Sequence, residues 1–202
     1  MLSTGGPKIA LVVKAKDISA YETVDGVNES VILNFSQTGN DSLRIKRISI
    51  PKNKNFSVCS LPNYINWIQV ISGKCNGNDN LMADEHICFI PENSSVLLNA
   101  LEDTFVVLCT VKNYQRFNKE IFQPSPTVKI INWKEEPILQ SVHDNRKRIY
   151  IATKNLWDTD AVKGEMIIYP KNTKAPAHYH VGAEHFQYVL TGNGIAFIGE
   201  MK

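Results

Sequence analysis

The sequence lacks the features that mark three large classes of protein. Its net charge is only +2 over 202 residues, so it has no basic excess of the kind that nucleic-acid-binding domains carry. No apolar run approaches the about 20 residues that a membrane-spanning helix needs. The first residues do not combine a basic start with a long apolar stretch, as a signal peptide does. We therefore expect no nucleic-acid partner and no membrane association.

Closely spaced cysteine pairs are also missing. None of the four cysteines stands in a C-x-x-C pair. Cys59, Cys88 and Cys109 lie within apolar runs, where buried free thiols are the ordinary occupants. This pattern favours a reduced, cytoplasmic setting.

Helical periodicity is the last absence, since no stretch keeps it over about 11 residues. Short apolar and β-branched runs alternate instead with Gly, Asn, Asp and Pro clusters, which is typical of a sandwich, barrel or jelly roll. The sequence therefore predicts an all-β fold, with strands at 9–13, 30–35, 67–71, 86–90, 95–100, 104–111, 148–153, 164–169, 186–190 and 194–199.

A proline-rich segment and an internal match suggest two related parts. The segment QPSPT at 123–127 is the best linker candidate, because two prolines in five residues interrupt a sheet ladder. It divides the chain into 1–122 and 128–202. WIQVISG at 67–73 and FQYVLTG at 186–192 align at an offset of 119, since 192 − 73 = 119. We expect two tandem copies of one fold.

The densest group of metal-ligating residues is PAHYHVGAEHFQYVLTGNG, residues 176–194. His178 and His180 are one residue apart, a spacing that places both imidazoles on one face of a strand. His185 follows after a turn, at the start of the next predicted strand. Two neighbouring strands can thus present three imidazoles to one point. Neutral imidazole suits Zn, Fe, Ni or Cu, and three such ligands leave coordination positions open for a substrate.

This segment resembles the first motif of the cupin superfamily, G-x5-H-x-H-x3-4-E-x6-G, through His178, His180 and Gly192. The resemblance implies a double-stranded β-helix, or jelly roll. It also implies a bound divalent transition metal (Fe, Zn, Ni, Mn or Cu), a small-molecule substrate and a homodimer. In these terms, 1–122 would be a degenerate cupin domain and 128–202 the N-terminal part of a metal-binding one.

The third metal ligand depends on the register of the motif. Counting six residues back from Gly192 places His185 at the family's glutamate position, whereas a three-residue gap after His180 would place Glu184 there. We favour His185, a departure from the family pattern. If His185 points inward, strand alternation points Gln187 inward as well. Gln187 is then a candidate to contact a metal ligand or the substrate, or it satisfies a nearby backbone group.

The first part looks like a copy that has lost its metal. The segment 85–100 has the spacing of the second cupin motif, G-x5-P-x-G-x2-H-x3-N, with Pro91 at the proline. The offset of 119 transfers the other ligands, and the four expected ligand positions then read Cys59, Leu61, Asn66 and Val96. We expect this copy to bind no metal. The second motif of the second copy would lie near residue 210, so we expect that copy to be incomplete at Lys202.

Two functions remain open at this point. The first is a metal-dependent cupin enzyme, most often a dioxygenase of the Fe(II) type, with isomerases, decarboxylases and lyases as further possibilities. The alternative is a non-catalytic cupin that binds a small molecule. No helix-turn-helix segment is visible, so a DNA-binding regulator is not expected. His86 and His143 have no ligand-like neighbours, and we expect structural roles for both.

Overall fold

The computed structural model describes residues 11–23, 25–39, 41–119 and 127–198. Most of the predicted linker 123–127 therefore lies outside the described residues. Within them, each helix is a single short turn: η1 (Ala15–Asp17), η2 (Phe35–Gln37), η3 (Tyr114–Phe117) and α1 (Lys154–Trp157). The predicted all-β fold is confirmed. No helix of the described part is long and apolar enough to cross a membrane.

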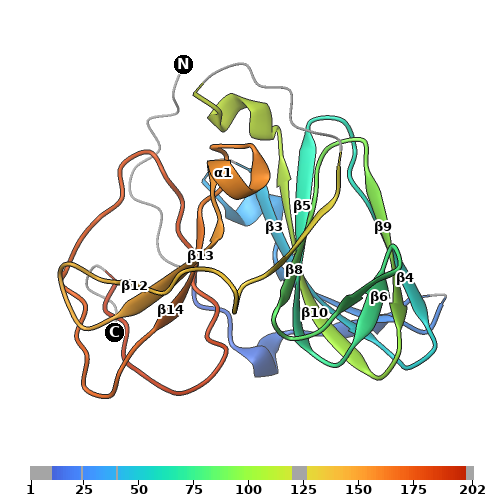
Figure 1. Cartoon of the computed structure of the whole chain (residues 1–202), viewed down its shortest axis with the longest axis horizontal. Helices are drawn as coiled ribbons and strands as arrows, with labels where there is room; N and C mark the ends of the chain where they lie inside the picture. The colour runs from blue at the N-terminus through green and yellow to red at the C-terminus, as the bar shows by residue number, and fades with distance from the viewer. Residues whose placement is uncertain (1–10, 24, 40, 120–126, 199–202) are drawn as a thin grey trace.

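Two antiparallel sheets face each other and form the larger part of the molecule, called here the sandwich (Figure 1). The first sheet has the order β1 (Ala20–Glu22), β2 (Asn28–Leu33), β3 (Leu43–Ile50), β10 (Thr104–Lys112), β5 (Tyr64–Ser72), β8 (His86–Ile90) and β11 (Lys129–Asn132). The second has the order β4 (Asn55–Cys59), β9 (Ser95–Ala100), β6 (Cys75–Gly77) and β7 (Asn80–Met82).

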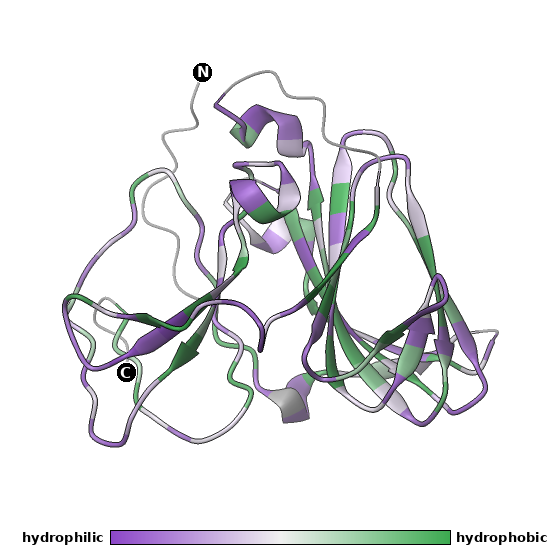
Figure 2. Cartoon of the chain, viewed as in Figure 1, coloured by the Kyte–Doolittle hydropathy of each residue, from purple (hydrophilic) through white to green (hydrophobic). Residues whose placement is uncertain are grey.

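Strand alternation supplies the core of the sandwich. Every second residue of the facing strands is apolar and buried, because successive side chains of a strand point to opposite faces. Figure 2 shows these apolar stretches along the facing strands. The central cluster contains Ile48, Ile50, Val58, Ile68, Val70, Cys75, Met82, Cys88, Ile90, Val96, Leu98, Ala100, Val106 and Leu108.

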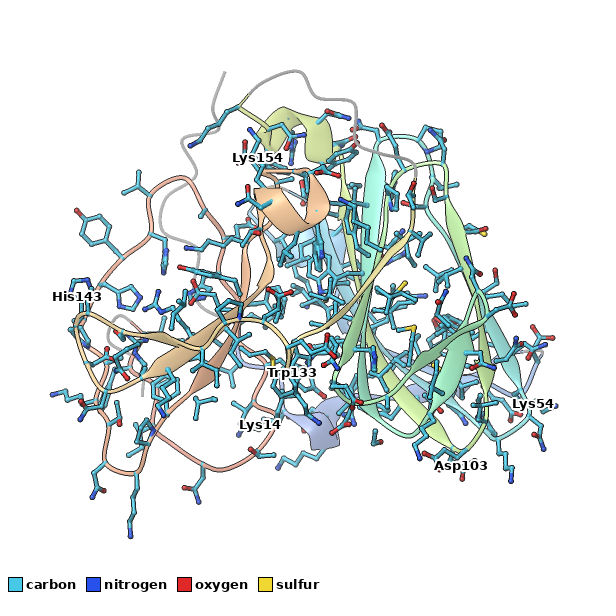
Figure 3. The ribbon with its side chains drawn as sticks, in the orientation of Figure 1. Lys14, Lys54, Asp103, Trp133, His143 and Lys154 are labelled. Carbon is cyan, nitrogen blue, oxygen red and sulfur yellow. The ribbon has the colours of Figure 1, made fainter. Side chains whose placement is uncertain are left out.

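The chain then crosses to a smaller unit. β11 pairs with β8 and forms an edge of the first sheet, so a strand that follows the predicted linker extends this sheet. Trp133 comes next, and its Nε1 donates a hydrogen bond to the carbonyl oxygen of Asp84 at 3.0 Å. Figure 3 shows Trp133 between the sandwich and the smaller unit. These contacts fix the crossing point on the sandwich.

The smaller unit, called here the C-terminal sheet, consists of β12 (Leu139–Gln140), β13 (Lys147–Ala152) and β14 (Gly164–Ile168). Helix α1 connects β13 to β14 and carries Trp157, which is fully buried. The Trp157 ring stacks on Phe89 with ring centres 4.9 Å apart and tilts against Trp67 at 5.7 Å. Trp157 therefore anchors the C-terminal sheet on the outer face of the first sheet.

Two strands of the C-terminal sheet pair in the same register as two strands of the sandwich. Lys147 pairs with Ile168, and subtracting 119 from both gives 28 and 49, the pair Asn28–Ser49 of β2 and β3. The register shift between Tyr150 and Ala152 likewise corresponds to the shift between Val31 and Leu33. β13 and β14 thus pair as β2 and β3 do, at the same offset of 119 that relates 67–73 to 186–192.

Most predicted strands are confirmed, with ends shifted by a few residues, but the last two and the first are wrong. Residues 186–190 and 194–197 form no strand, residue 198 makes only an isolated bridge, and residues 11–13 are irregular. The physical reason is pairing: a strand needs hydrogen-bonded neighbours. In the sandwich, β5, which contains the segment that aligns with 186–192, lies between β8 and β10. No described strand occupies those places beside 186–190, whose side chains are exposed.

Candidate metal centre

The three predicted histidine ligands lie together after β14. The ring centres of His178 and His180 are 5.2 Å apart, and those of His180 and His185 are 4.6 Å apart. Three imidazoles that bind one ion through nitrogens about 2.1 Å from it would have ring centres about 4.5–5.3 Å apart. The two separations that involve His180 fall in this range, and neutral imidazole nitrogens suit a transition metal.

The imidazole nitrogens of these three histidines do not converge on one point. In the described ranges, no three or more His, Cys, Asp or Glu side chains form a group that could hold a metal ion. His178 Nδ1 lies 3.0 Å from the carbonyl oxygen of Pro176, and all three histidines are exposed. The expected pair of neighbouring strands is not formed here. The sequence thus brings the rings together without the sheet that would fix their orientation.

Electrostatics favour the neutral, ligand form of His185. Partial desolvation lowers the pKa of this imidazole, even though the side chain remains exposed, and the charges of His180 and His178 lower it further. Glu165 acts in the opposite direction and raises the pKa. A lowered pKa keeps the nitrogen lone pairs available near neutral pH, as metal binding requires.

Glu165 is the residue near this cluster that sequence reasoning missed. It lies on β14 opposite Tyr150, on the face that β14 turns away from the buried Ile149. Its carboxylate interacts with Arg148 at 3.7 Å and with Lys163 at 3.3 Å. The signal was the strand alternation of GEMII, which places Glu165 and Ile167 on one face.

An ion pair at the same offset of 119 occurs in the sandwich. Subtracting 119 from Glu165 and Arg148 gives 46 and 29, and Lys46 pairs with Glu29 at 2.5 Å in the sandwich. An ion pair thus joins β13 to β14 as one joins β2 to β3, with the charges exchanged. As a result, a carboxylate of β14, rather than an ammonium group, interacts with His185.

The other residues discussed in the sequence analysis form no site with the three histidines among the described residues. Glu184 and Gln187 are exposed, and the strand that was to orient Gln187 is not formed. His86 has the structural role expected of it, because its Nδ1 accepts a hydrogen bond from the Ala83 amide at 3.1 Å. His143 lies in the exposed connection between β12 and β13, at the outer end of the C-terminal sheet (Figure 3).

The sandwich positions two of its four expected ligand equivalents differently from the prediction. On β4 the buried residue is Val58, so alternation turns Cys59 outward, and Leu61 is exposed as well. Asn66 and Val96 are buried: Thr110 Oγ1 donates to Asn66 Oδ1 at 2.6 Å, and Val96 belongs to the apolar core.

Comparisons with known proteins support the fold and no more. No family model matches the chain, and no curated protein is similar in sequence. Among solved structures, a candidate glyoxylate-induced protein from Pseudomonas aeruginosa matches with a TM-score of 0.52 at 14% identity, over 68% of this chain and 54% of that one. Quercetin 2,3-dioxygenase from Acinetobacter baumannii matches with a TM-score of 0.43 at 22% identity, over 59% and 43%.

A smaller protein, the RmlC-like cupin from Shewanella frigidimarina, matches with a TM-score of 0.42 at 10% identity, over 49% of this chain and 87% of that one. The chain spans about half the length of the first two proteins. The match with the first of these proteins shows that the chain shares its fold, a jelly roll of facing antiparallel sheets.

Proposed function

We propose that the chain is a metal-binding bicupin that acts on a small molecule, with His178, His180 and His185 as the metal ligands. One observation carries the proposal: the three imidazole rings gather at separations of 5.2 and 4.6 Å, although they stand on an exposed segment. Exposed histidines have no hydrophobic reason to cluster, and like protonated rings would repel. Neutral imidazoles avoid that repulsion and can share one metal cation through their nitrogen lone pairs.

The tandem arrangement is supported by the pairing of the strands. β13 and β14 repeat the register and the irregularity of β2 and β3 at an offset of 119 residues. The same offset relates 67–73 to 186–192. We infer that the chain contains two copies of the cupin fold, of which the sandwich is the first and the C-terminal sheet begins the second.

The residues fit a transition metal in number and in donor chemistry. His178, His180 and His185 would hold it through neutral nitrogens and leave positions open for a substrate. A metal bound there would supply Lewis-acid chemistry or, as Fe(II), chemistry with O₂. Glu165 would lie beside the bound ion, where its carboxylate favours a positive charge and stabilises a protonated or metal-bound His185. We propose a dioxygenase of the Fe(II) type as the leading activity.

A non-catalytic binding protein is the second candidate, and the sandwich favours it. There the counterparts of the ligands include Val96, which lies in the apolar core, and Asn66, which is engaged with Thr110. A chain that has dispensed with one metal centre can use the fold for binding alone.

Metal analysis of the purified full chain tests the proposal. We expect one equivalent of a transition metal after reconstitution and its loss in His178→Ala and His180→Ala. The matched control is His143→Ala, which removes an exposed histidine outside the cluster. Oxygen uptake with catechol-like and diketone substrates then separates the dioxygenase from the binding protein. Equal metal content in all variants would refute the metal centre.

A further inference from the structure

A second cluster of polar side chains lies in the sandwich, away from the histidines, and we call it the Phe35 cluster. The Phe35 ring on η2 carries two cations: the Arg44 guanidinium carbon lies 4.9 Å from its centre and the Lys112 Nζ 4.7 Å. Tyr64 packs edge-on against the same ring at 6.5 Å. Phe35, Arg44 and Lys112 are all half-buried.

The strand register extends this cluster across the sheet. Thr110 on β10 lies opposite Arg44 on one side and Asn66 on the other. The buried side chains of Thr110 and Asn66 are hydrogen-bonded, with Thr110 Oγ1 donating to Asn66 Oδ1 at 2.6 Å. On β3 and β10, Arg44 and Thr110 share the inner face with Ile48 and Leu108 of the core. The cations therefore stand at the end of the sandwich interior.

The charges of this cluster are not compensated. Within the described residues neither Arg44 nor Lys112 forms an ion pair, whereas Lys46 on the same face is paired with Glu29. The Arg44 Nε–H is buried and has no hydrogen-bond partner in the described part of the chain. Both charges contact one ring, so they lie within about 10 Å of each other, close to the Debye length at physiological ionic strength. Two cations without ion-pair partners, together with a buried N–H donor that has no acceptor, favour the binding of an anion.

We propose that the Phe35 cluster is a metal-free binding site for a small oxyanion, a carboxylate or a phosphate. Arg44 supplies a planar fork of N–H donors that matches either group, and Lys112 supplies a point charge. The site lies in the copy that has no metal ligands and does not depend on the histidine cluster. In this copy of the fold, fixed cations take the place of a metal in holding an anion.

Calorimetric titration of the full chain tests this site, with phosphate and malonate as separate probes and a chelator present throughout. We expect saturable binding of at least one probe, and the two titrations distinguish a phosphate from a carboxylate. Arg44→Gln and Lys112→Gln should each weaken binding by about tenfold or more, the typical effect of losing a charged hydrogen-bond partner. His185→Ala should bind as the wild type does, which separates this site from the proposed metal centre.

Arg47→Gln is the matched control. Arg47 lies on the same strand, also covers an aromatic ring, Phe105, at 4.8 Å, and also has a buried Nε–H without a partner among the described residues, but it lies on the opposite face of the sheet and shares its ring with no second cation that the structure describes. We expect its variant to bind both probes normally. Saturable binding that Arg47→Gln weakens as much as Arg44→Gln, or no saturable binding at millimolar concentrations, would overturn the proposal.

Thermal unfolding distinguishes binding from a purely structural role of Arg44. If Arg44 binds an anion, the probe raises the unfolding midpoint of the wild type, and Arg44→Gln abolishes that rise. Without probe, the variant should unfold at or above the wild-type midpoint, because it removes one of two repelling charges. A lowered midpoint without probe, together with an unchanged response to the probe, would show that Arg44 serves packing alone.

Discussion

Replacing Trp157 by alanine should detach the C-terminal sheet from the sandwich. Trp157 is fully buried and contacts two aromatic rings of the first sheet, Phe89 and Trp67. Truncating a buried Trp or Phe to Ala costs about 3–5 kcal/mol, and the two ring contacts account for about 1–3 kcal/mol of this. The total stability of a domain is about 5–15 kcal/mol. We therefore expect Trp157→Ala to lose a large part of it.

Trp157→Phe provides the control. The Nε1–H of Trp157 is buried and has no partner among the described residues, and such an orphaned donor costs about 1–3 kcal/mol. Phenylalanine removes that donor and keeps a ring on Phe89, so the loss of ring area is partly offset. We expect this variant to lie within about 1.5 kcal/mol of the wild type.

Urea unfolding followed by far-ultraviolet circular dichroism measures both variants, and amide hydrogen exchange locates the loss. The amides of β13 should lose protection in Trp157→Ala before those of β5 do, since only the docking of the C-terminal sheet is weakened. The reasoning fails if Trp157→Ala unfolds within about 1 kcal/mol of the wild type, or if β13 stays as protected as in the wild type.

Two further predictions concern single groups. The Arg146 side chain and backbone amide hold the pKa of Asp144 well below its usual range, so this carboxylate stabilises the fold above pH of about 4 and the benefit is lost as the pH falls further. Asp144→Asn should lower the unfolding midpoint at pH 7, and a difference that persists undiminished in acid would contradict this. Burial raises the pKa of Cys75 to about 11 and of Cys88 to about 12, while Cys59 is exposed. A thiol reagent at pH 8 should label Cys59 alone in the native protein, and fast labelling of more thiols would show that the core is open.

The sequence was most informative where local pattern and pairing agree. The runs at 86–90 and 95–100 are strands with the predicted bounds, because apolar alternation and partner strands coincide there. At the offset of 119, found from one weak match, β13 and β14 have the same register as β2 and β3. The register of paired strands depends on the whole fold. Equal registers at this offset therefore support the prediction of a repeated fold.

The candidate site was only partly predictable. The H-x-H spacing and His185 indicated that the three rings would lie together, and they do. Their strands were predicted from composition alone, and 186–190 is irregular because no described strand lies beside it. Glu165 was missed because its approach to His185 depends on the tertiary arrangement. The outward turn of Cys59 was missed because a single-residue change of phase reverses every side chain of a strand.

The affinity of the full chain for a transition metal, measured for Glu184→Ala and His185→Ala side by side, tests the proposed centre most directly. Because the two residues are adjacent, a regular strand would turn them to opposite faces, so only one can be a ligand. We predict that His185→Ala weakens binding by more than the about 10–100-fold that loss of a supporting residue causes, and that Glu184→Ala changes it by no more than that. If Glu184→Ala removes the metal while His185→Ala leaves it bound, the assignment of the third ligand is wrong, and if neither variant matters, the histidine cluster is not a metal centre.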